Sequence, residues 1–163
     1  MTLSTTFSAG RRVTATELQG IVTAVVGLQV PDMAIATRVA SQSIPHATGT
    51  VLSCDTQVVD TNTMFAPTDS KIYAKRDGVY SVTAHVLCAG PNFMIIDLNI
   101  NGSSKATQAA PTDASGVVRL SAATHVYMTT GQYLEVSIYQ SSTGSVSRNA
   151  TGRLTMTYCG ATA

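Results

Sequence analysis

The sequence is poor in both charge and aromatic side chains. It contains no tryptophan, and charged residues make up only 12% of its 163 positions, against about 25% in an average globular protein. The net charge is +1 without a basic stripe, which argues against a protein that binds nucleic acid through its phosphates. The scarcity of aromatic rings also removes the stacking platforms that bind single-stranded nucleic acids. Threonine, serine, asparagine and glutamine must supply the polar surface instead, and threonine favours β-strands.

Cysteine is also scarce, and its spacing excludes two common structural uses. The three cysteines, Cys54, Cys88 and Cys159, include no C-x-x-C pair, so they match neither a disulfide framework nor a zinc site. We expect them to be buried, small apolar residues in a reducing cell, with Cys88 in the core because it shares a strand face with Val86. The spacing leaves one bridge open, either Cys54–Cys88 or Cys88–Cys159.

Motifs of enzymes and metal sites are missing as well. No Gly-x-Ser-x-Gly, His-Glu-x-x-His, P-loop or EF-hand pattern occurs. The histidines are scattered, and His85 and His125 fall on the polar faces of predicted strands, which favours surface or interface roles. Asp55, Asp60 and Asp69 are expected as solvated turn residues rather than as a Ca²⁺ site. We therefore expect a protein that is not an enzyme and that uses no cofactor or metal.

A short helix is predicted near the N-terminus. Thr14 and Glu17 have the spacing of a capping box, and the apolar residues that follow recur at i, i+3, i+4 and i+7. The helix should cover residues 15–27 and end before Pro31. The stretch 21–30 is too short to span a bilayer, which needs about 20 apolar residues, and we expect an unsecreted protein. The four apolar residues of the helix are Leu18, Ile21, Val22 and Val25.

After the helix, the apolar residues change from helical spacing to alternation. Residues 80–86 alternate apolar and polar side chains, and residues 93–100 do the same before a hairpin signal at Asn101-Gly102. About eight to ten short strands alternate with turns in this way, and the connections are too short for parallel crossovers. We predict an all-β fold, with an antiparallel β-sandwich or jelly roll in residues 34–163. An extended arm that carries the short helix precedes it, in residues 1–33.

The order of three motifs resembles a known family. A Gly-Val-Tyr step opens a strand at residues 78–80, and a later strand ends in Asn-Gly at 98–102. A long strand then leads through a Gly-centred turn into another apolar alternation at 125–136. Residues 50–140 thereby resemble the jelly roll shared by the complement-q globular head and tumour necrosis factor. Gly131-Gln132 is a departure, because the family often has Gly-Asp there, and the collagen stalk of the complement proteins is absent. The resemblance implies a trimer around a three-fold axis.

The N-terminal segment carries a second resemblance. Residues 7–18 read Phe-Ser-Ala-Gly-Arg-Arg-Val-Thr-Ala-Thr-Glu-Leu, which is similar to the opening of many small virion proteins of actinobacterial phages. This resemblance implies a phage virion structural protein, a capsid decoration or head-fibre subunit assembled in the host cytoplasm. Its partners would be major capsid or tail subunits, with no nucleic acid and no membrane. The residues expected to dock on the virion are Phe7, Arg11, Arg12, Leu18, Ile21 and Val25.

The trimer interface is predicted from strand positions that face away from the core. Tyr127, Tyr133 and Tyr139 lie opposite the apolar alternation of their strands, and Ile95 opposes Ile96. A monomer would expose these side chains on a charge-poor surface. Tyrosine buries well at interfaces, because its ring is apolar and its hydroxyl still finds a partner.

An adhesin is the alternative interpretation. A minor tail protein that binds a glycan or protein on the host surface would present its ligand site on loops, where function is grafted onto such folds. The candidate loops are residues 60–70, 103–116 and 141–149. Head and tail locations in the virion are both compatible with the sequence.

Overall fold

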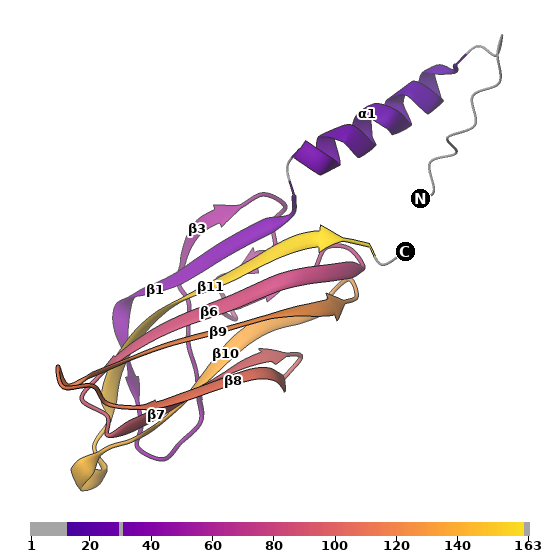
Figure 1. The fold of residues 1–163 in the computed structure, drawn as a ribbon. Coiled ribbons are helices and arrows are strands. Elements are labelled where there is room, and N and C mark those ends of the chain that lie inside the picture. The colour runs from indigo at the N-terminus through magenta and orange to yellow at the C-terminus, as the bar shows by residue number, and fades with distance from the viewer. Residues whose placement is uncertain (1–12, 30, 162–163) are drawn as a thin grey trace. The chain divides into compact units, whose positions relative to one another are not determined.

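Two antiparallel sheets contain all eleven strands of the described residues (Figure 1). The structure, a computed structural model, describes residues 13–29 and 31–161, in which eleven strands, one α-helix and one 3₁₀ turn occur. The prediction of an antiparallel all-β fold with a short N-terminal helix is confirmed. In chain order the elements are α1 (Ala15–Gln29), β1 (Met33–Ile44), β2 (Thr50–Val51), β3 (Thr56–Asp60), β4 (Phe65–Ala66), β5 (Lys71–Tyr73), β6 (Gly78–Ala89), β7 (Phe93–Ile100), β8 (Ser103–Pro111), β9 (Val117–Met128), β10 (Tyr133–Ser141), η1 (Thr143–Ser145) and β11 (Arg148–Gly160).

The capping box predicted for the helix is present. The backbone amide of Glu17 donates to Thr14 Oγ1 over 3.2 Å, and Glu17 Oε2 accepts a bond from the Thr14 amide over 2.9 Å. Such bonds satisfy donors that the start of a helix leaves without partners. α1 continues to Gln29, beyond the predicted end, and the chain divides between Pro31 and Asp32 into two compact units. No helix in the described residues is long and apolar enough to cross a membrane.

The unit that begins at Asp32 is a two-layered sandwich. One sheet has the strand order β3-β1-β11-β6-β9, and the other has the order β4-β5-β10-β7-β8, with β2 paired to β10. The last strand in the sequence, β11, lies between β1 and β6 and pairs with both of them antiparallel (Figure 1). The five-stranded sheet is therefore completed only when the C-terminal strand is in place.

Strand alternation fills the space between the two sheets, as the sequence predicts. Tyr80, Val82 and Cys88 point inward from β6 and are buried, whereas His85 and Leu87 on the same strand are exposed. The Tyr80 hydroxyl keeps a partner in the core, because it donates to a backbone carbonyl over 2.8 Å. The facing sheet contributes buried residues of β7 and β10, which are Met94, Ile96, Leu98, Leu134, Val136 and Ile138.

An ion pair between a buried aspartate and a partly exposed arginine fixes the start of the sandwich. Asp32 is buried and accepts two bonds from the guanidinium of Arg76, over 2.6 Å from Nε and 2.8 Å from Nη2. Arg76 also lies over the ring of Tyr158, with 4.8 Å between the guanidinium carbon and the ring centroid. Because Arg76 precedes β6 and Tyr158 lies on β11, these contacts tie the first residue of the sandwich to two central strands.

The glycine-containing turns at residues 101–102 and 129–132 connect their strands in different ways. Asn101 and Gly102 have φ values of 49° and 75°, the left-handed conformation that a type I′ hairpin turn between β7 and β8 requires. The turn at residues 129–132 instead carries the chain from β9 in one sheet to β10 in the other. Its Thr130 donates from the backbone amide and the hydroxyl to Asp77 Oδ1, over 2.7 and 2.9 Å. Both bonds hold the pKa of Asp77 below its ordinary value, and the bond from the backbone amide has the larger effect.

Strands β3, β4 and β8 lack a signal in the sequence. β8 reads Ser-Ser-Lys-Ala-Thr-Gln-Ala-Ala-Pro and contains no large apolar residue. It is an edge strand that pairs only with β7, and its contribution to the core comes from Ala106 and Ala110. The predicted loop 103–116 is therefore wrong for residues 103–111, because an edge strand with small inward residues shows no apolar alternation.

At Gly152, strand β11 closely approaches both Leu52 and strand β6. A Cβ atom at this position would lie 2.6 Å from Leu52 Cδ2 and 2.8 Å from the carbonyl oxygen of His85. The leucine methyl group can move, but the carbonyl belongs to the neighbouring strand β6 and is held by the sheet. The position therefore accepts only glycine without a shift of the backbone.

We expect Gly152→Ala to lower the free energy of unfolding by about 1–3 kcal/mol, the usual cost of forcing atoms into a packed site. Urea denaturation followed by circular dichroism measures this loss. Gly49→Ala is the matched control, because a Cβ there meets no atom within 4 Å. Equal stabilities of the two variants would show that β11 tolerates a side chain at residue 152.

Candidate interaction surface

The outer face of the five-stranded sheet is covered mainly by short side chains. Thr83 on β6 lies between Thr155 on β11 and Ala123 on β9 in the strand register. Ser81, one position further along the same face, lies between Thr157 and His125. Hydroxyl and methyl groups therefore form this part of the face. A second molecule can approach it closely, but Arg153 lies two residues further along β11 on the same face and would need a partner in any contact that covers it.

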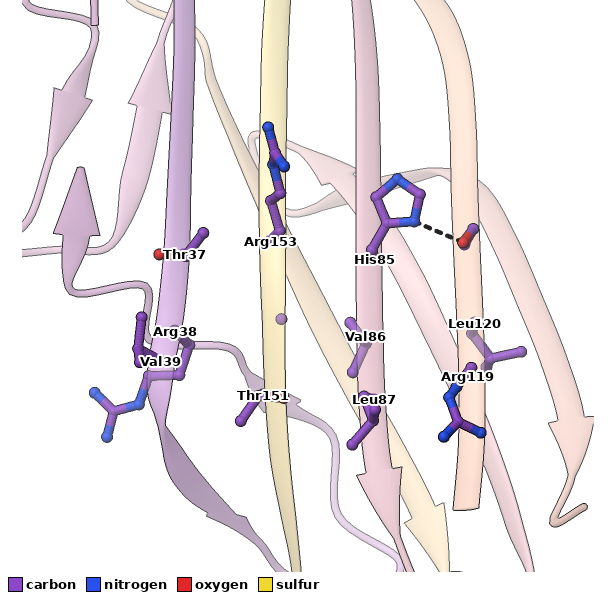
Figure 2. Close-up of a pocket in the computed structure, with 12 residues that line it drawn as sticks. Thr37, Arg38, Val39, His85, Val86, Leu87, Arg119, Leu120, Thr151 and Arg153 are labelled. Carbon is purple, nitrogen blue, oxygen red and sulfur yellow. Dashed lines mark hydrogen bonds between the residues drawn. The ribbon is translucent and has the colours of Figure 1, made fainter. Parts of the chain in front are cut away.

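A shallow groove of about 540 Å³ crosses four strands of the same face (Figure 2). Four of its residues form one transverse row, because Thr37 pairs with Arg153, Arg153 with His85, and His85 with Ser121. His85 Nδ1 and Ser121 Oγ are hydrogen-bonded over 2.7 Å, as the dashed line in Figure 2 shows. The backbone of Gly152 also lines the groove.

Three arginines line the groove, but two of them already have carboxylate partners. Arg38 Nη1 lies 2.5 Å from Asp55 Oδ2, and Arg119 Nη1 lies 3.2 Å from Asp113 Oδ2. Arg153 is exposed and forms no ion pair within the residues that the structure describes. The groove thus has one uncompensated positive charge rather than a concentrated cationic field.

Large apolar side chains are also exposed on this face. Val39 is 70% exposed, Tyr127 50% and Leu87 38%. Val39 and Leu87 line the groove, and Tyr127 lies near the far end of β9. Single exposed apolar residues are ordinary on protein surfaces, but here three of them share one face. Their neighbours are mixed, because Leu87 pairs in register with Arg119. The face thus combines exposed apolar and arginine side chains, both of which occur at protein–protein interfaces.

The tyrosines predicted for a trimer interface lie on two different sheets. Tyr139 and Ile95 are register partners on the outer face of the six-stranded sheet. Tyr133 lies on the same sheet, where the amino group of Lys71 is 4.0 Å from its ring centroid. Tyr127 belongs to β9 of the five-stranded sheet. Because the turn at residues 129–132 changes sheets, outward positions before and after it face opposite sides of the sandwich, so the four residues do not form one patch.

Only three of the six predicted virion-docking residues lie in the part of the chain that the structure describes. Phe7, Arg11 and Arg12 lie outside the described residues. Leu18 and Val25 are exposed on α1, and Ile21 is partly exposed there.

The histidines occupy three separate environments. His46 Nδ1 accepts a bond from the Ser142 amide over 3.1 Å, and His125 is exposed on β9. His85 and Ser121 have the distance of a base and a nucleophile, but Ser121 lies in mid-strand. Among the described contacts, no carboxylate orients His85, as the third member of a catalytic triad would. Within the same residues, no three histidine, cysteine, aspartate or glutamate side chains form a metal-binding group.

The three aspartates considered for Ca²⁺ binding each serve a different local contact. Asp55 pairs with Arg38. Asp60 accepts the backbone amides of residues 64 and 65 over 2.8 and 2.9 Å and so shapes the turn before β4. Asp69 accepts the Tyr73 hydroxyl over 2.5 Å. Asp55 and Asp69 are exposed and lie outside the strands, as expected, whereas Asp60 is the partly buried last residue of β3.

Comparison with solved structures shows the class of fold. The globular domain of zebrafish complement 1qA matches with a TM-score of 0.66 and 11% identity, over 80% of this chain and 99% of that one. Eiger TNF from S. frugiperda matches with a TM-score of 0.55 and 10% identity, over 82% and 95%. The chain therefore has the jelly-roll fold of complement 1q globular domains and TNF-like proteins. No family model and no curated protein sequence matches it.

All three cysteines are free thiols, so neither bridge left open by the sequence forms. Cys54 and Cys88 are buried, as expected, whereas Cys159 is exposed, contrary to the expectation for all three. Burial, with a smaller contribution from Asp55, raises the pKa of Cys54 from 9.0 to about 12. Burial also raises the pKa of Cys88. A thiol held in its neutral form is a poor nucleophile.

We expect the stability of the protein to fall as the pH rises from about 9 towards 12, because the unfolded chain ionises Cys54 before the folded chain does. Below pH 9 the contribution of this thiol is fully present. Urea unfolding at a series of alkaline pH values measures the slope, and Cys54→Ala should flatten it. An unchanged slope in Cys54→Ala would show that the other groups, such as Tyr73, account for the alkaline loss.

Proposed function

We propose that this protein is a non-enzymatic structural subunit of a bacteriophage virion, a capsid decoration or head-fibre subunit. Its N-terminal arm docks on other virion proteins, and its jelly-roll domain is displayed. The observation that carries the proposal is the division of the chain at residue 31, because a capped helix with exposed apolar residues precedes an autonomous sandwich. A helix of this length is marginally stable in water without a partner. The resemblance of residues 7–18 to phage virion proteins supports the assignment to a virion.

A host-surface adhesin is the alternative, and one feature of the structure favours it. Asn92 connects three loops at one end of the sandwich, because its carbonyl accepts the Thr112 amide and its side-chain nitrogen donates to Thr143 Oγ1 over 2.8 Å. Gly90 and Gly116 join two of the same loops by a backbone bond of 2.8 Å. Parts of the predicted loops 103–116 and 141–149 therefore form one polar surface that a glycan can contact.

A chain that lacks residues 1–30 tests which of these two proposed functions the protein has. We expect a soluble, folded β-domain that no longer incorporates into phage particles, because the sandwich keeps its core while the docking segment is lost. Circular dichroism checks the fold, and mass spectrometry of purified particles checks incorporation. Normal incorporation of the truncated chain would contradict docking through the arm. Co-sedimentation of the truncated domain with host cell walls would favour the adhesin.

We also propose that the domain self-associates as a trimer through the outer face of the five-stranded sheet. The jelly-roll fold and the family resemblance support three-fold association, and the surface itself supports this face. Val39, Leu87 and Tyr127 are exposed there, on a face that also carries threonine, serine and arginine side chains. By contrast, Tyr139 and Ile95 on the other sheet are only partly exposed, because neighbouring strands already cover part of each side chain.

The two faces are distinguished by one charged substitution on each. Thr83→Arg places a long cation in the middle of the five-stranded face, and we expect it to shift the protein from trimer to monomer, because burying an unpaired charge is costly. Tyr139→Arg should leave the trimer intact. Light scattering at micromolar concentration gives the mass of each variant. If only Tyr139→Arg dissociates the trimer, the interface lies on the six-stranded sheet. A monomeric parent protein would refute the trimer.

A further inference from the structure

The helix α1 has apolar side chains that are exposed in the structure. Leu18 is 57% exposed, Val22 and Val25 are each 47% exposed, and Ile21 is partly exposed. Within the described residues 13–29, α1 is the only element, so no second element of that segment packs against these side chains. The spacing of the apolar residues indicates what kind of surface would cover them.

The spacing is that of a coiled-coil seam. Leu18, Ile21 and Val25 are separated by three and then four residues, and Leu28 in the sequence continues the series with a step of three. This is the a-d-a-d order of two heptads, in which each residue inserts between residues of a facing helix. Val22 occupies the adjacent e position and widens the apolar side. Thr16 lies on the opposite side of the helix, at a position that is exposed and polar.

We propose that α1 packs against the same helix of other copies, as a short parallel three-helix coiled coil with Leu18, Ile21 and Val25 in its seam. This inference rests on the proposed trimer, in which three-fold symmetry starts the three helices at the same end. Leucine at a with isoleucine at d in the first heptad favours assemblies of more than two helices, whereas valine at a with leucine at d in the second is typical of dimers, so the symmetry of the proposed trimeric domain sets the number of helices. The apolar e position also suits a trimer, because more of each helix is buried there than in a dimer.

The low charge of α1 favours a second copy of α1 as its binding partner rather than a charged protein surface. The only charged residue of α1 is Glu17, and its carboxylate is engaged by the amide and the hydroxyl of Thr14 in the helix cap. Three parallel copies therefore place no charged side chain at the a, d or e positions, which are Leu18, Ile21, Val22 and Val25. The helix alone is too short to associate strongly, but attachment to a trimeric domain raises its effective concentration.

Disulfide trapping in the full chain tests the seam. In a Cys159→Ser background, Val25→Cys places a thiol in the seam and Thr16→Cys places one on the opposite side. Cys54 and Cys88 are buried and stay unreactive. On oxidation with diamide, we expect Val25→Cys to form disulfide-linked pairs about tenfold faster than Thr16→Cys, because the seam thiols are held side by side. Leu18→Asp added to Val25→Cys should abolish this preference.

Light scattering of the reduced samples separates this inference from the proposed trimer. A trimeric mass with preferential trapping at residue 25 supports both. A trimeric mass with equal trapping at residues 16 and 25 overturns the coiled coil and leaves the apolar side of α1 to a different virion protein. A monomeric mass overturns the trimer and the coiled coil together.

Discussion

The insertion of β11 between β1 and β6 is the constraint on which the rest of the structure depends. The last strand pairs with the first strand on one side and with a central strand on the other, so the five-stranded sheet joins the two ends of the sandwich domain. The contact requires a glycine at residue 152, where the backbone carbonyl of His85 leaves no space for a side chain. The same pairing aligns Thr37, Arg153 and His85 in one row. Both the groove and the flat outer face are consequences of this closure.

The features that the sequence predicts well are those that depend on near neighbours. The Thr14–Glu17 cap, the inward residues of β6 and the Asn101-Gly102 hairpin all require information from only a few adjacent positions. The features it misses depend on contacts between distant segments. β8 has no apolar alternation because it is an edge strand, and the predicted tyrosine patch fails because the turn after β9 changes sheets. A pattern of alternating residues gives the face of a strand but not the sheet to which the strand belongs.

The shortage of charge has a physical use in the folded domain. Several of the acidic residues are occupied within the sandwich: Asp32 binds Arg76, and Asp77 holds the turn that contains Thr130. The outer face of the five-stranded sheet carries threonine, serine and alanine beside Arg153, its one unpaired arginine among the described residues. Threonine can lose contact with water at a small cost, because its single hydroxyl needs few new partners and its methyl group gains by burial. A charge-poor composition is thus consistent with a face that is covered in the assembled protein.

The two proposed contacts strengthen each other. A coiled coil of two heptads is weak by itself, and a flat sheet face rich in short side chains buries little apolar area for each residue. When both belong to one trimer, formation of either contact makes the other intramolecular, and the pair associates more strongly than the sum of two separate weak contacts. The arrangement also gathers three N-terminal segments at one end of a helix bundle. A particle surface with repeated subunits can then engage several segments at once, so that firm attachment does not require a strong single docking site.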